Sequence, residues 1–282
     1  MSVISTVITQ HCTAHASDSF LTILKADGVR EVVEARKPKL VYVKHWRGAF
    51  AFWGLAQCGQ WSTLDWLCGQ AQQAGNFSSA EDFANAIAAG LNEDLAKIPL
   101  TRAVDKGIGI HFTAYERISD YWIPELFLIS NWAGIPYTNI RPDGVGVSRE
   151  TYHILKEKEG VIPAPEHREP RFRIEVHQAL QSGTMFRYNN GDPELFNAAA
   201  NAILDIFFRL MQRRVLNDPS AEKTHCALVR RPIEVISSLL TDFSKEGKRL
   251  IGGKLHDLCI SPNGTCWSST GDCAGYQHGT SK

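Results

Sequence analysis

The chain has 282 residues, 44% of them hydrophobic, and its 30 Lys and Arg residues balance 30 Asp and Glu residues. This length suits one large domain or two small ones, and the balanced charge argues against the basic surface that nucleic-acid binding uses. No apolar run approaches the ~20 residues of a membrane helix, and the start lacks the basic and apolar regions of a signal peptide.

The first nineteen residues predict two strands and a polar turn. Val3-Ile4 and Val7-Ile8 flank small hydroxylated residues, and residues 13–16 are again mostly small or β-branched. No charged residue occurs before Asp18. Uncharged runs rich in β-branched residues are typical of buried strands. Because chain ends normally fray, a core strand that starts at residue 2 suggests that the terminus itself is a working part.

Further along the chain, hydrophobic periodicity predicts alternating groups of strands and helices. Residues 20–37 fit either a polar loop or an exposed hairpin. Ser78 and Glu81 form a capping-box pattern, and Pro232 suits the first turn of a helix. Strands are predicted at 39–44, 49–55, 108–115 and 122–130, and helices at about 57–73, 79–97, 193–214 and 233–246.

Two segments differ in composition from the rest. Residues 133–171 are rich in proline and contain a Lys-Glu-Lys-Glu run, which predicts a long excursion on the surface or at an interface. Residues 265–282 are rich in Ser, Thr, Gly and Cys, which predicts a poorly ordered tail. We therefore expect one domain over residues 1–264, followed by a flexible tail.

Ser2 is the candidate for chemistry at the start of the chain. It follows the initiator Met, and a small second residue commonly allows that Met to be removed. Ser2 would then carry a hydroxyl and a free α-amine, whose pKa of about 7.7–8.0 suits a general base. The ordinary interpretation is that many proteins begin Met-Ser.

The order and spacing of several short motifs resemble proteasome β-type subunits of the N-terminal-nucleophile hydrolase superfamily. In that pattern an Asp follows the nucleophile by sixteen residues, as Asp18 follows Ser2, whereas Thr6 would give a spacing of twelve. The resemblance covers roughly residues 1–75 and 233–264. Its other elements are Ala16-Ser17-Asp18-Ser19, Lys39-Leu40, the strand Gly48–Ala56, and the Gly252-Gly253 pair with the turn to Gly264.

The resemblance implies an α+β fold of the four-layer αββα sandwich type. It implies an amide-bond hydrolase in which Ser2 is nucleophile and base, Lys39 and Asp18 tune it, and the Gly54 N–H supplies the oxyanion hole. The substrate would be a peptide or small amide, and the protein would be a homo-oligomer such as a ring. Composition and charge separately predict a cytoplasmic protein that binds neither nucleic acid nor a membrane.

Each of these residues also has an ordinary interpretation. Asp18 suits a turn, Lys39 (or Lys37) a strand end that reaches solvent, and Gly54 the junction of a strand and a helix. The resemblance also fails at residues 248–251, Lys-Arg-Leu-Ile, where the family has a supporting Asp and Ser. Ser182 is only a weak match to another supporting Ser. The second hypothesis is therefore an inactive, proteasome-subunit-like scaffold.

The sequence contains no recognisable motif for binding a cofactor or a metal. Seven cysteines without a secretory signal predict reduced thiols in a cytoplasmic protein. His11 and His15 share one face of a strand and Cys12 takes the other, so these three side chains do not converge on a metal. We expect no metal and no cofactor.

Overall fold

The structure is a computed structural model. It describes residues 3–24, 30–34, 38–98, 106–133, 139–141, 144–151, 170–190, 193–213, 215, 220–243, 251, 253–271 and 273–276. Only the backbone is described for residues 21–24, 30–34, 133, 139–140, 170–172, 193–196 and 274–275. No helix among the described residues is long and apolar enough to cross a membrane.

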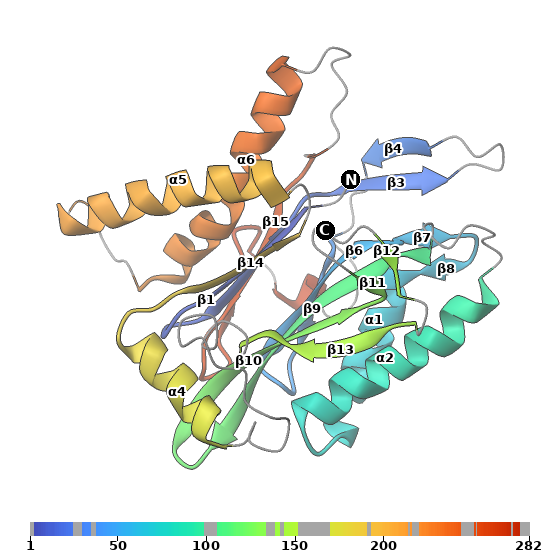
Figure 1. Cartoon of the computed structure of the whole chain (residues 1–282), viewed down its shortest axis with the longest axis horizontal. Helices are drawn as coiled ribbons and strands as arrows, with labels where there is room; N and C mark the ends of the chain where they lie inside the picture. Colours follow the sequence, from blue (N-terminus) through green and yellow to red (C-terminus); the bar gives the residue numbers. More distant parts are fainter. Residues whose placement is uncertain are drawn as a thin grey trace.

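Two five-stranded sheets form the centre of the chain, and neighbouring strands in both are antiparallel (Figure 1). The first sheet has the order β14 (Phe186–Asn190), β1 (Ile4–Ile8), β2 (Thr13–Ser17), β15 (His256–Ile260) and β16 (Cys266–Trp267). The second has the order β13 (Gly146–Arg149), β10 (Tyr121–Ser130), β9 (Ile108–Ile118), β6 (Gly48–Gly54) and β5 (Leu40–Val43).

Three small hairpins and several helices complete the described fold. The hairpins pair β3 (Phe20–Leu24) with β4 (Arg30–Glu34), β7 (Gln57–Cys58) with β8 (Trp61–Ser62), and β11 (Trp132–Ala133) with β12 (Asn139–Ile140). The α-helices are α1 (Thr63–Gln73), α2 (Ala80–Lys97), α4 (Pro170–Gln181), α5 (Pro193–Gln212) and α6 (Glu222–Phe243), and the 3₁₀ helices are η1 (Ala74–Asn76) and η4 (Cys273–Tyr276).

Four apolar clusters occur among the described residues, and three of them hold the two sheets and their covering helices together. One lies between the second sheet and α1 and α2, and another between the first sheet and α6. The third lies between the sheets and includes Ile4 from β1, Leu40 from β5 and Leu258 from β15. The strand composition explains this placement, because β1 and β2 are buried along their whole length and must be covered on both faces.

The predicted strands of the core are confirmed, with small shifts in their ends. The hairpin alternative at 20–37 matches β3 and β4. The first helix starts at Thr63 rather than near residue 57, because residues 57–62 form the β7–β8 hairpin and Ser62 caps the helix. The second helix is capped by Ser79, which accepts from Asp82 N, and not by the predicted Ser78.

The prediction that Pro232 opens a helix is wrong. Pro232 lies inside α6, which begins ten residues earlier at Glu222. A proline in a helix removes one backbone hydrogen bond and normally breaks or kinks the helix. Packing overrides this preference here, because Cys226, Val229 and Ile233 are buried against the first sheet.

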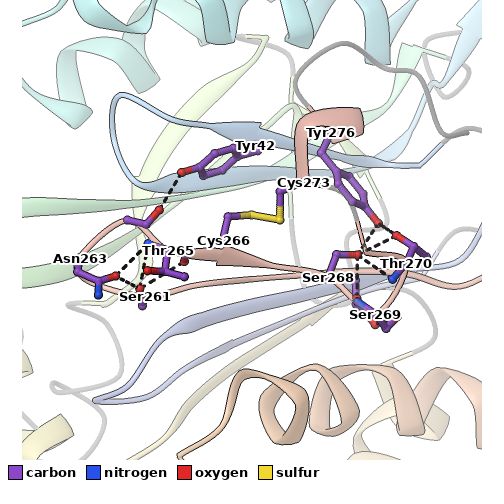
Figure 2. The surroundings of a disulfide bond; sticks show 12 residues. Tyr42, Ser261, Asn263, Thr265, Cys266, Ser268, Ser269, Thr270, Cys273 and Tyr276 are labelled. Atoms are coloured by element: carbon purple, nitrogen blue, oxygen red, sulfur yellow. Dashed lines mark hydrogen bonds between the residues drawn. A yellow bond between two sulfur atoms is a disulfide. The ribbon is translucent and has the colours of Figure 1, made fainter.

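The structure also contains elements that the sequence did not predict. Within 133–171, β13 adds an edge strand to the second sheet, and α4 and β14 follow. Part of the expected tail is also structured, because Cys266 and Cys273 form a disulfide and Tyr276 is buried between the sheets (Figure 2). This disulfide corrects the expectation that all seven thiols are reduced.

Candidate active site

The candidate site is built on a buried ion pair at one end of the two sheets. Asp18 directly follows β2, and Lys39 directly precedes β5. Lys39 Nζ lies 2.6 Å from Asp18 Oδ1, and the two side chains are 1% and 0% exposed. A buried charge is costly unless it is paired, so each of these residues requires the other.

The same carboxylate also binds the backbone at the start of β1. Val3 N donates to Asp18 Oδ1 over 3.2 Å, and Asp18 N donates to Val3 O over 3.3 Å. Lys39 Nζ makes a second hydrogen bond to the Phe20 carbonyl, 2.5 Å away. Asp18 therefore links the Lys39 ammonium to the first described residue of the chain.

Burial changes the chemistry of the Lys39 amine. Desolvation lowers the pKa of Lys39, while the charge and the hydrogen bond of Asp18 act in the opposite direction. A lysine with a lowered pKa releases its proton more readily than a lysine in water. Lys39 therefore differs from a lysine in an exposed salt bridge.

Ser2, the predicted nucleophile, lies outside the described residues.

Gly54 ends β6, on the strand that pairs with β5. Phe52 N donates to Lys39 O over 3.1 Å, so Gly54 is two residues further along this strand, about 7 Å. Its φ of 89° is in the left-handed region, and a Cβ would come within 2.2 Å of the Gly107 carbonyl oxygen, a distance that no real Cβ occupies. The backbone requires glycine here, whether or not its N–H has a catalytic role.

Three further polar side chains lie around the pair, and the sequence did not single them out for it. Ser17 and Ser19 flank Asp18, and His256 lies directly opposite Ser17 on β15. All three are buried, and Ser17 Oγ, Ser19 Oγ and His256 Nε2 have no hydrogen-bond partner among the described parts of the protein. Only the strand register brings residues 17 and 256 together, so no local sequence signal would have found them.

Two other groups of buried titratable residues have internal explanations. Between the sheets, His15 and His111 share Thr6 Oγ1, at 3.0 and 2.9 Å, and burial lowers the pKa of each to about 3. Under α6, Cys12 lies with His225, and the pKa of Cys12 falls to about 6 through hydrogen bonds from Cys259 and His225. No set of three His, Cys, Asp or Glu side chains among the described residues is arranged to hold a metal.

Comparisons with known proteins give little further information. No known family profile and no curated protein matches this sequence. A solved structure that resembles the chain is described as the Anbu (Gly-1) mutant from Hyphomicrobium sp. strain MC1. It shares 9% identity over 98% of this chain and 92% of that one, with a TM-score of 0.46. Similarity at this level assigns no activity.

Proposed function

We propose that this protein is an amide-bond hydrolase whose nucleophile is the hydroxyl of Ser2, made N-terminal by removal of Met1. The observation that carries the proposal is the buried Lys39–Asp18 pair, whose carboxylate also binds the Val3 backbone next to Ser2. A buried, paired lysine beside a terminal hydroxyl and amine is the arrangement that N-terminal nucleophile chemistry needs.

The proposed reaction proceeds in two steps. Ser2 Oγ attacks the amide carbonyl carbon, its proton passes to the Ser2 α-amine, and that amine protonates the departing amine. Water then attacks the ester carbonyl carbon, the bond from that carbon to Ser2 Oγ breaks, the carboxylic acid leaves, and a proton from the water returns to Ser2 Oγ. Lys39 favours the ionised nucleophile by its charge, Asp18 holds Lys39, and the Gly54 N–H is the proposed oxyanion donor.

The fold supports this assignment at the level of packing. Helices α1 and α2 cover one sheet, α6 covers the other, and the sheets pack against each other, in agreement with the proposed four-layer αββα sandwich. We further propose a peptide or small amide as substrate, a homo-oligomer as the working form, and the cytoplasm as its location.

A non-catalytic scaffold is the second candidate, and the sequence at 248–251 favours it. Residues Lys248 and Ile251 occupy the positions where the resemblance calls for Asp and Ser. A scaffold would keep the Lys39–Asp18 pair for stability alone. In that case Ser2 would have no special reactivity.

Acylation by a β-lactone distinguishes the two candidates. The wild type should gain one acyl group, and Ser2→Ala should gain none. Lys39→Met should slow the reaction by roughly 100-fold, because the charge that favours the ionised nucleophile is lost. The matched control is Lys44→Met, since Lys44 lies at the other end of β5 and is exposed. Equal labelling of the wild type and Ser2→Ala, or no labelling of either, would favour the scaffold.

A further inference from the structure

The residues around the Lys39–Asp18 pair include an unusual group of unpartnered polar atoms. Ser17 Oγ, Ser19 Oγ and His256 Nε2 are all buried, and no protein group within the described residues bonds to them. Buried polar atoms in native proteins nearly always have a partner, either protein or ordered water, because leaving one unpaired costs about 1–3 kcal/mol. Ser17 and His256 lie opposite each other on neighbouring strands, so their two unpartnered atoms call for a shared explanation.

The strand register places Ser17 and His256 on the inner face of the first sheet. Ser17 lies opposite Ile4 on β1 and opposite His256 on β15. Residues directly opposite each other in a sheet project to the same side, and Ile4 belongs to the cluster between the sheets. Ser17 and His256 therefore face the second sheet, from which Lys39 approaches.

Electrostatics also places His256 near Lys39. Burial lowers the pKa of His256 to about 4, and the positive charges of Lys254 and Lys39 contribute to this shift. His256 is therefore neutral at neutral pH, and its Nε2 can donate or accept one hydrogen bond depending on the tautomer. The edge-on ring of Tyr276, 6.4 Å away between centroids, packs against the imidazole.

We propose that Ser17 and His256 form a polar shell that holds water against the Lys39–Asp18 pair, and that His256 is a positioning residue of the site. The shell is almost closed to solvent, with each member at most 1% exposed, so a water molecule fits it better than a larger ligand. Its effect on catalysis rests on the function proposed above. Its effect on the Lys39 ammonium does not.

The shell can be tested with two pairs of variants. His256→Leu removes the polar atom, whereas His256→Gln keeps a polar group at similar reach. Ser17→Ala removes the hydroxyl of the shell. Thr13→Val removes the other buried hydroxyl on this face of β2, which lies opposite Ile260 at the far end of the strand.

The first measurement is the rate of β-lactone acylation at Ser2 across pH. His256→Leu and Ser17→Ala should each lower the rate about 10-fold or more, because misplacing a reacting group has effects of this size. His256→Gln should stay within about 3-fold of the wild type and Thr13→Val within about 2-fold. Unchanged rates in both His256→Leu and Ser17→Ala would overturn the proposal.

The second measurement does not depend on activity. Nitrogen-detected NMR of the Lys39 amine gives its pKa in each folded variant. A shell that solvates the ammonium predicts a lower Lys39 pKa in His256→Leu and Ser17→Ala, and no change in Thr13→Val. If the wild type resists acylation, the proposed function fails and this measurement alone decides about the shell. An unchanged Lys39 pKa in both variants would then reject it.

Discussion

The carboxylate of Asp18 and the ammonium of Lys39 lie 2.6 Å apart, and neither side chain is more than 1% exposed. Asp18 directly follows β2 of the first sheet, and Lys39 directly precedes β5 of the second sheet. The pair therefore ties the end of β2 to the start of β5. A pair buried this deeply contributes through the cost of breaking it rather than through a large net attraction.

Asp18→Asn should therefore destabilise the fold by about 3–5 kcal/mol, because it leaves the Lys39 charge buried and unpaired. Urea unfolding measures this change. Asp18→Asn combined with Lys39→Met should cost less than the sum of the two single changes, since the double variant buries no lone charge.

The control for this prediction is the exposed pair of Lys97 and Glu93 on α2, whose side chains are 63% and 74% exposed. Lys97→Met should leave the free energy of unfolding almost unchanged, because exposed ion pairs contribute little. Similar losses for Asp18→Asn and Lys97→Met would contradict the burial argument.

Glu125 should make stability depend on pH. Burial raises the pKa of Glu125 from 4.5 to about 7, although Arg149 and Arg173 oppose the shift. Arg173 Nε lies 3.1 Å from Glu125 Oε1, and Arg173 also binds Glu116. The negative charge of Glu116 adds to the rise in the pKa of Glu125. The folded protein therefore binds more protons at Glu125 than the unfolded chain between pH 4.5 and about 7.

The contribution of Glu125 to stability is thus fully present below pH 4.5 and is lost as the pH rises through about 7. Glu125→Gln removes the titrating carboxyl group. The stability of this variant relative to the wild type should therefore increase from pH 5 to pH 8. Urea unfolding at the two pH values measures the difference. Glu93→Gln, at an exposed site on the same protein, is the control, and the prediction fails if both variants follow the same curve.

The disulfide between Cys266 and Cys273 should stabilise the end of the described chain. The two cysteines are separated by 7 positions in the sequence. For a loop of this length, the loss of chain entropy in the unfolded state predicts a stabilisation of about 2–3 kcal/mol. The disulfide also tethers Tyr276, whose hydroxyl lies 3.2 Å from the Ser268 and Thr270 hydroxyls (Figure 2). Reductant should therefore lower the melting temperature of the wild type.

A variant with both Cys266→Ser and Cys273→Ser should melt at the reduced wild-type temperature and should not respond to reductant. Cys58→Ser changes a free cysteine and should keep the response of the wild type. A wild type that melts identically with and without reductant would show that this disulfide contributes no stability.

Gly54→Ala tests whether the glycine has a structural role. Its φ of 89° and the approach of the Gly107 oxygen predict a loss of roughly 3 kcal/mol or more, from backbone strain and a clash. Gly59 also has a positive φ of 57°, but a Cβ there meets nothing within 4 Å. Gly59→Ala should cost only about 1 kcal/mol. Equal losses in thermal unfolding would mean that the contact with Gly107 is unimportant.

Local patterns predicted the parts of the fold that local forces determine. The uncharged, β-branched run at residues 3–8 predicted β1, and the four-residue spacing of Phe83, Ile87 and Leu91 predicted α2. Pro232 misled because its effect on α6 is decided by burial against the first sheet. β13 was missed because four half-buried residues at a sheet edge show no clear alternation.

The candidate site was predictable only in part. Spacing and resemblance pointed to Asp18 and Lys39, and the structure brings these two together. His256 and Ser17 are more than two hundred residues apart in sequence, and only the pairing of β2 with β15 joins them. The disulfide was missed for a different reason, since an odd cysteine count does not indicate which thiols approach each other.

The most direct test of the central claim is the mass of the N-terminal peptide after the purified protein reacts with a β-lactone. The account predicts a peptide that begins at Ser2 and carries one acyl group on that residue, with the same adduct forming far more slowly in Lys39→Met under the same conditions. A peptide that retains Met1, or one that begins at Ser2 and stays unmodified at high reagent concentration, would contradict it.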